Sequence, residues 1–177
     1  MDTRTLCLGI LTLSDASGYE IKKQFEEGPL AYFYQTGFGS IYPALKSLKN
    51  DGMVVCTEII QHGRPSKKVY SITSKGLELL RENLAGTPAR DKLRSEAIAT
   101  LFFAQFLDEK HLHEVFEEYM ERNRQAAEHI KSLNPDSISS DCQFTNGLGI
   151  AVYEAIVRYM EDNRHLLFDE DNDNDNK

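Results

Sequence analysis

The sequence contains no tryptophan and only three cysteines among its 177 residues. Cys7, Cys56 and Cys142 are odd in number and far apart, so neither a disulfide framework nor a paired-thiol metal site is predicted. No apolar run approaches the ~20 residues of a membrane span, and the segment from Met1 to Ser14 lacks the charged start and cleavage site of a signal peptide. These absences predict a cytoplasmic protein with reduced cysteines.

Signatures of catalysis and of metal binding are missing as well. The chain has no glycine-rich phosphate loop, no nucleophile elbow and no carboxylate pair placed against a histidine. His111 and His113 point away from each other on a predicted helix, which favours surface histidines over metal ligands. The acidic run at 169–176 lacks the glycine and the bidentate glutamate of an EF-hand loop. We therefore expect no enzyme, no cofactor and no metal site.

The charge is distributed unevenly along the chain. Residues 1–85 hold 10 Lys and Arg against 9 Asp and Glu, whereas residues 86–177 hold 10 against 19, within a net charge of −8. Between Lys46 and Lys75, six cations stand against two acids. A local basic surface is therefore expected in the first half, although the pI of the whole chain is ≈ 5.1.

The hydrophobic pattern of residues 1–85 predicts three helices, a β-hairpin and a fourth helix. The third helix starts between Thr36 and Ser40 and ends before Gly52, a residue type common just past a helix end. Its apolar residues Ile41, Leu45 and Leu48 share one face. Helices and hairpin in this order predict a winged helix-turn-helix domain.

The predicted hairpin carries three cations, Arg64, Lys67 and Lys68, at its tip. β-branched and aromatic residues on both sides of these cations favour strands. Thr73 then caps the fourth helix, which directs Leu77, Leu80 and Leu84 inward. A basic hairpin beside a helix-turn-helix is suited to the phosphates of DNA.

A second stripe of the third helix, formed by Tyr42, Lys46 and Lys49, offers donors and cations but no carboxylate. A helix that enters the major groove needs such residues for base edges and phosphates. The alternative is a lysine-bearing face that only contacts solvent. Because the basic hairpin follows directly, the pattern favours DNA binding.

Three stretches carry a family resemblance: SGYEIKKQF (Ser17 to Phe25), GSIYPALKSLKNDGMV (Gly39 to Val54) and GRPSKKVYSITSKG (Gly63 to Gly76). In this order and spacing they resemble the winged-helix domain of the PadR family of bacterial transcriptional regulators. RDKLRSEAI at Arg90 to Ile98 and the acidic helices after it resemble the helical dimerisation region of longer members. Those members include the virulence-gene activator branch, whose wing ends in a similar KVYSIT.

The resemblance implies a homodimer on inverted-repeat, double-stranded DNA, usually as a repressor and sometimes as an activator. It places the DNA contacts on the third helix and on the wing, at Ser40, Tyr42, Lys46, Arg64, Lys67 and Lys68. Some family members respond to phenolic or multidrug-like ligands. Because this chain has no tryptophan, the tryptophan-lined drug pocket of some members is not expected here.

The second half of the chain is predicted to be helical after a linker at 85–91. One helix holds the apolar residues from Leu93 to Phe106, a second starts at Asp108, and a third runs from about Ser140 to about Leu167. Their apolar stripes are too wide for one chain to cover, which predicts a helical dimerisation domain at 90–168. The acidic tail at 169–177 has no apolar residue and is predicted to be disordered.

Four aromatic residues of the second half, Phe102, Phe106, Phe116 and Tyr119, could line a pocket for a small aromatic effector. Aromatic residues at helical spacing are more often plain core. The fold class is therefore mainly α with a small β-hairpin. Two functions stay open: a DNA-binding transcriptional regulator, and a winged-helix interaction module whose basic wing binds an acidic protein partner.

Overall fold

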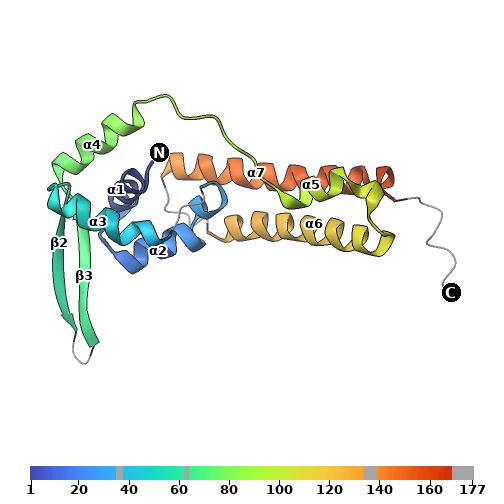
Figure 1. The fold of residues 1–177 in the computed structure, drawn as a ribbon. Coiled ribbons are helices and arrows are strands. Elements are labelled where there is room, and N and C mark those ends of the chain that lie inside the picture. The colour runs from blue at the N-terminus through green and yellow to red at the C-terminus, as the bar shows by residue number, and fades with distance from the viewer. Residues whose placement is uncertain (35–37, 62–63, 134–138, 169–177) are drawn as a thin grey trace. The chain divides into compact units, whose positions relative to one another are not determined.

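The computed structural model describes residues 1–34, 38–61, 64–133 and 139–168 (Figure 1). The chain divides into two compact units, Met1–Asp91 and Lys92–Lys177, and each has its own hydrophobic cluster. The predicted disordered tail at 169–177 lies outside the described residues. In the described part of the chain, no helix combines the length and the apolarity that crossing a bilayer requires.

The N-terminal unit packs four helices against a small sheet (Figure 1). Its helices are α1 (Thr3–Leu13), α2 (Gly18–Glu27), α3 (Ile41–Asn50) and α4 (Ser74–Leu84), with 3-10 turns at Pro29–Tyr32 and Phe38–Ser40. The predicted inner face of α3 is confirmed, because Ile41, Leu45 and Leu48 are fully buried. Leu84 is 54% exposed instead of inward, since α4 runs past the end of the core at its last residue.

Local side-chain signals fix the ends of these helices. Ser17 caps α2 in a capping box with Glu20, and Thr73 caps α4 by accepting a hydrogen bond from the Gly76 amide. Gly52 has φ +73° just after α3, a conformation that favours glycine. Cap residues of this kind can be recognised in the sequence, and the predicted cap at Thr73 is confirmed.

The sheet has three antiparallel strands in the order β1-β3-β2. They are β1 (Ala16–Ser17), β2 (Val54–Gln61) and β3 (Arg64–Ile72). The predicted hairpin is β2 and β3, and β1 adds a third strand that pairs Ala16 with Tyr70 and Ser17 with Val69. Two residues are too few to show an alternating pattern, so β1 had no sequence signal.

In the described residues of the C-terminal unit, every regular element is a helix or a 3-10 turn. Its elements are α5 (Glu96–Phe102), α6 (Glu109–Ser132) and α7 (Ser140–Asp162), with 3-10 turns at Ala104–Phe106 and Arg164–Leu166, here named η4. The predicted helix start at Asp108 is confirmed to within one residue, because Asp108 is the N-cap of α6, and α6 and α7 lie side by side and antiparallel (Figure 1). The prediction of one helix from Leu93 to Phe106 is wrong, because α5 starts only at Glu96 and ends at Phe102.

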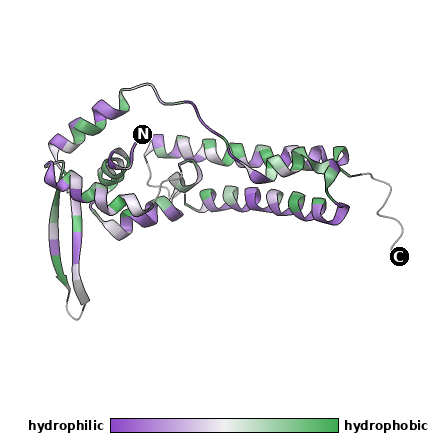
Figure 2. Ribbon diagram, viewed as in Figure 1, coloured by the Kyte–Doolittle hydropathy of each residue, from purple (hydrophilic) through white to green (hydrophobic). Residues whose placement is uncertain are grey.

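Hydrophobic residues recur along the whole of α7 (Figure 2). Four of its large apolar side chains, spaced to lie on one side of the helix, are between 46% and 72% exposed: Phe144, Leu148, Val152 and Tyr159. We call these four residues the α7 stripe. Large apolar side chains gathered on one face are typical of surfaces that bind another protein.

Candidate nucleic-acid interface and apolar cavity

Helix α3 presents two different faces. The face formed by Ile41, Leu45 and Leu48 is fully buried in the N-terminal unit. On the other side, Tyr42 is 55% exposed and Lys46 and Lys49 are exposed too. The predicted outer stripe therefore reaches the surface, and α3 itself contains no carboxylate that would repel a phosphate.

Ser40 belongs to a different side of this helix. Its hydroxyl oxygen lies 2.9 Å from the Thr3 hydroxyl oxygen on α1. On the same side, Arg4 of α1 donates to the Ser47 hydroxyl at 2.7 Å and to the Asp51 carboxylate at 2.7 Å. The structure thus groups Tyr42, Lys46 and Lys49 but brings Ser40 to α1.

The wing cations lie further from the hairpin turn than predicted. The ladder places Lys67 opposite Ile59 and Lys68 opposite Glu58, so both lysines belong to the strand pair and not to its tip. The sequence placed the strands on either side of the three cations, whereas β3 already begins at Arg64 and includes all three. The tip itself, at 62–63, and the side chain of Arg64 lie outside what the structure describes.

Two acids pair with these lysines. The Lys67 ammonium lies 2.7 Å from the Glu20 carboxylate of α2, and the Lys68 ammonium lies 3.5 Å from Glu58. The hydrogen bond from Lys67, together with hydrogen bonds from Ser17, lowers the pKa of Glu20 from 4.5 to about 2. Sequence reasoning missed Glu20 as a partner because 47 residues separate it from Lys67.

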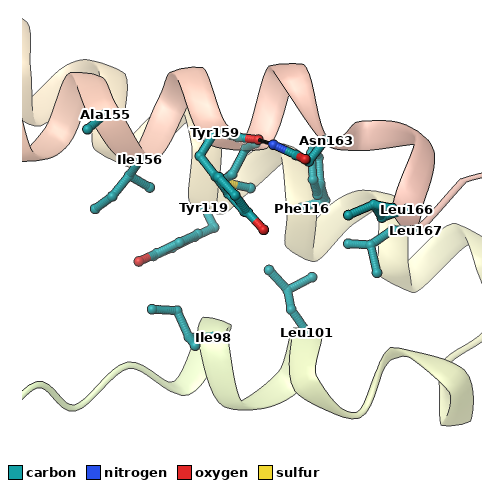
Figure 3. Close-up of a pocket in the computed structure, with 11 residues that line it drawn as sticks. Ile98, Leu101, Phe116, Tyr119, Ala155, Ile156, Tyr159, Asn163, Leu166 and Leu167 are labelled. Atoms are coloured by element: carbon teal, nitrogen blue, oxygen red, sulfur yellow. Dashed lines mark hydrogen bonds between the residues drawn. The ribbon is translucent and has the colours of Figure 1, made fainter.

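An apolar cavity of about 530 Å³ lies in the C-terminal unit between α5, α6, α7 and η4 (Figure 3). Its lining residues are Ile98, Leu101, Phe116, Tyr119, Ala155, Ile156, Tyr159, Met160, Asn163, Leu166 and Leu167. The volume suits a small organic ligand. Most of these residues are apolar, and the lining residues with polar side-chain atoms other than sulfur are two tyrosines and one asparagine.

Only half of the predicted effector residues line this cavity. Phe116 and Tyr119 are in its wall, whereas Phe102 and Phe106 are 81% and 77% exposed and do not line it. The sequence grouped these two with Phe116 and Tyr119 because it extended one helical period through Phe103, where the backbone leaves the helix. Tyr159 and Met160 follow Ile156 by three and four residues, so the three side chains lie on one face of α7. This spacing could have identified the part of α7 that lines the cavity.

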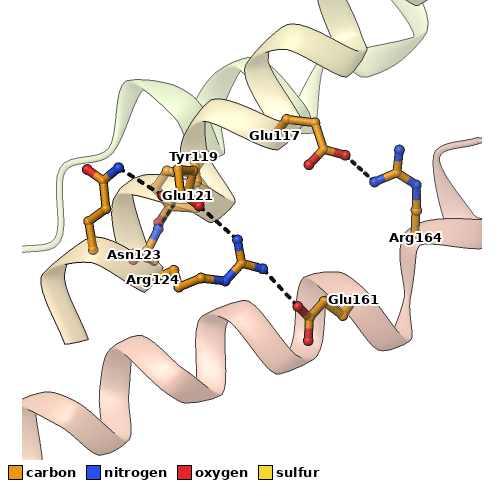
Figure 4. A network of polar contacts seen from close by, with 8 residues as sticks. Glu117, Tyr119, Glu121, Asn123, Arg124, Glu161 and Arg164 are labelled. Atoms are coloured by element: carbon orange, nitrogen blue, oxygen red, sulfur yellow. Dashed lines mark hydrogen bonds and ion pairs between the residues drawn. The ribbon is translucent and has the colours of Figure 1, made fainter. Parts of the chain in front are cut away.

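Polar contacts hold η4 against α6 at one end of the cavity. Arg164 pairs with the Glu117 carboxylate (Figure 4) and lies over the rings of Phe116 and Phe168, 5.2 and 5.0 Å from their centroids. The Phe168 ring stacks on His113 at 3.9 Å. Arg124 of α6 also pairs with Glu121 of the same helix and with Glu161 of α7 (Figure 4). These contacts join α6 to η4 and to α7.

A family model, the transcriptional regulator PadR-like family, matches residues 7–82. A solved structure of the PadR-like transcriptional regulator BC1756 from Bacillus cereus aligns with 95% of this chain and 97% of its own, at a TM-score of 0.80 and 28% identity. Over residues 7–82 this chain matches the PadR-like transcriptional regulators. The structural alignment covers the predicted winged helix-turn-helix together with the helical region behind it.

Two curated transcriptional regulators are also similar to this chain in sequence. A probable transcriptional regulator of Mycobacterium tuberculosis, Rv1176c, is 39% identical over 61 residues, which is 34% of this chain and 32% of the relative. The negative transcriptional regulator PadR of Bacillus subtilis is 29% identical over 118 residues, or 66% of this chain and 64% of the relative. The matches therefore span about a third and just under two thirds of these relatives.

The fold of this PadR-like chain agrees with that of PadR in a complex with operator DNA. The two structures align over 93% of this chain and 98% of the PadR chain, with a TM-score of 0.76 and 21% sequence identity. The prediction of a winged helix-turn-helix followed by a helical region is confirmed. The matched family and the Bacillus subtilis relative are transcriptional regulators, which agrees with the expectation of a chain without enzymatic activity. Among the described residues, no three His, Cys, Asp or Glu side chains gather as metal ligands.

Proposed function

We propose that this PadR-like chain is a sequence-specific DNA-binding regulator that acts as a homodimer on an inverted-repeat operator. In this proposal residues 1–85 bind DNA and residues 90–168 dimerise. The observation that carries it is the exposed, acid-free stripe of Tyr42, Lys46 and Lys49, which lies opposite the buried face of α3. A helix with these two faces can enter the major groove while the core holds it in place.

The contacts divide by chemistry. Tyr42, near the start of α3, is placed to meet a base edge, and Ser40 can do so if its hydroxyl exchanges Thr3 for the base. Lys46 and Lys49 suit phosphates, as do Arg64 and Lys68 on the wing. The complex of PadR with operator DNA supports this arrangement for a chain of the same fold.

Selection of bound sequences from a random duplex pool tests the proposal directly. We expect the full chain to recover an inverted repeat whose half-sites lie about one helical turn, on the order of 34 Å, or a multiple of it apart. Enrichment of no sequence would contradict the proposal. Retention of an acidic protein partner by a wing that binds no duplex would then favour the alternative function of a protein-interaction module.

Single substitutions separate positioning contacts from base contacts. Lys46→Ala should weaken binding to operator and to unrelated DNA alike, and should reduce the log–log salt slope by ~0.9. Tyr42→Ala should cost operator binding ~1–3 kcal/mol more than nonspecific binding, because a base edge is lost. Titrations of both duplexes at several salt concentrations measure both effects. Equal losses for Tyr42→Ala on the two duplexes would contradict base recognition.

Repression is the proposed direction of control. The support is the Bacillus subtilis relative, which is named a negative transcriptional regulator. Transcription in vitro from a promoter that overlaps the recovered operator should fall when the protein is added. Increased transcription would instead assign the chain to the activators.

A small aromatic effector is the second proposed ligand. The specific observation is the apolar cavity of about 530 Å³, whose polar groups come from Tyr119, Tyr159 and Asn163. A structure of PadR from Bacillus subtilis in complex with p-coumaric acid supports a ligand of this class. Calorimetry with p-coumaric acid should give binding that Ile156→Phe weakens, by filling the cavity, and that Phe102→Leu, outside it, leaves unchanged. Equal effects of the two variants would contradict this site.

A further inference from the structure

The first turn of α2 contacts the wing through one carboxylate. Oε2 of Glu20 accepts hydrogen bonds from the Ser17 amide and the Ser17 hydroxyl, both at 2.8 Å. Oε1 of the same residue accepts from the Lys67 ammonium at 2.7 Å. The two oxygens therefore join the cap of α2 to the middle of β3.

The same turn also contacts α3. A Cβ atom at Gly18 would lie 2.7 Å from Cε1 and 3.2 Å from Cδ1 of the Tyr42 ring. A methyl group at position 18 would collide with the Tyr42 ring in its present position. The ring can lie there because Gly18 has no side chain. Two residues of one turn, Gly18 and Glu20, thus touch the predicted base-contacting side chain and the wing.

We propose that Glu20 and Gly18 position the wing and Tyr42 for DNA, and that Lys67 is a positioning residue whose ammonium stays with Glu20 instead of binding a phosphate. The inference rests on the proposed DNA-binding function and deepens it. A phosphate that approached Lys67 would also meet the Glu20 carboxylate, 2.7 Å from the ammonium. Because the pair carries no net charge, it releases few counterions from DNA.

Glu20→Gln is the decisive variant, since the two roles of Lys67 predict effects of opposite sign. Glutamine also closes a capping box, so α2 keeps its start while the charge is lost. If Lys67 positions the wing, operator affinity falls about two- to fivefold, the range of a partly exposed ion pair, and the salt slope stays unchanged. If Lys67 binds a phosphate, loss of its competitor raises the affinity and steepens the slope.

Lys67→Met removes the ammonium and keeps most of the stem. For a positioning residue, operator affinity should fall as in Glu20→Gln, the double variant should be no weaker than either single one, and the salt slope should not move. A drop of ~0.9 in the slope for Lys67→Met would assign Lys67 to a phosphate and overturn the inference.

Glu58→Gln is the matched control. Glu58 pairs with Lys68 across β2 and β3, so its change removes the same charge from the wing without touching α2. We expect its operator affinity to stay the same or to rise. The wild-type chain is titrated first with the selected operator. Failure of the wild type to bind DNA would overturn the proposed function, whereas wild-type binding with unchanged or tighter Glu20→Gln binding would overturn this inference alone.

Discussion

Gly76, in the first turn of α4, has no room for a side chain. A Cβ atom there would lie 2.1 Å from the Met53 carbonyl oxygen, which already accepts hydrogen bonds from Thr73. We predict that Gly76→Ala destabilises the N-terminal unit by about 3 kcal/mol, because backbone must move. Gly9 in α1 has nothing within 4 Å of such an atom, so Gly9→Ala should stabilise by about 0.5–1 kcal/mol. Urea unfolding measures both, and equal midpoints would contradict the prediction.

Glu20 gives the stability a predictable dependence on pH. Its pKa is about 2 in the folded protein and ordinarily 4.5, so the folded state favours the carboxylate. The stabilisation is therefore complete above about pH 4.5 and is lost as pH falls towards 2. Because Glu20 is 48% exposed, we expect about 1 kcal/mol, not the full value of the shift. The difference in unfolding free energy between wild type and Glu20→Gln should shrink across this window. A difference that grows on acidification would contradict the assignment.

Helices α2 and α3 meet where Gly18 faces the Tyr42 ring. Gly18→Ala should displace the ring, which is 55% exposed and can move outward, so unfolding should change little. Operator binding should fall about as far as in Tyr42→Ala, and the double variant should lose no more than Tyr42→Ala alone. A double-mutant cycle on the selected operator measures this coupling. Additive losses would show that Gly18 acts independently of Tyr42.

Elements marked by local signals could be predicted, and elements made by distant contacts could not. Helix ends in the N-terminal unit are set by the side chains of Ser17 and Thr73 and by the backbone of Gly52. Because these signals are local, the sequence was sufficient to predict the order of the N-terminal helices. The pairing of Lys67 with Glu20 joins residues 47 positions apart and leaves no local pattern. Phe103 ends α5 although the apolar period continues through it, so Phe102 and Phe106 do not line the cavity beside Phe116 and Tyr119.

On the scale of the whole molecule, the α7 stripe supports the proposed homodimer. We predict that Leu148→Glu, which puts a charge at its centre, converts the protein to a monomer and lowers operator affinity at least tenfold, since only one half-site remains held. Gln143→Glu places the same charge on α7 outside the stripe and should stay dimeric. Light scattering at micromolar concentration measures the mass. A monomeric wild type would contradict the dimer itself.

Tyr159 belongs to the α7 stripe and also lines the cavity. If the stripe is the dimer contact and the cavity holds the effector, the two equilibria share this side chain and are thermodynamically linked. If dimer formation changes the affinity for the effector by a certain factor, binding of the effector changes the dimer association constant by the same factor. The apparent effector affinity then depends on protein concentration around the dimer dissociation constant. A cell could thereby change its response to one effector level by changing only the amount of regulator.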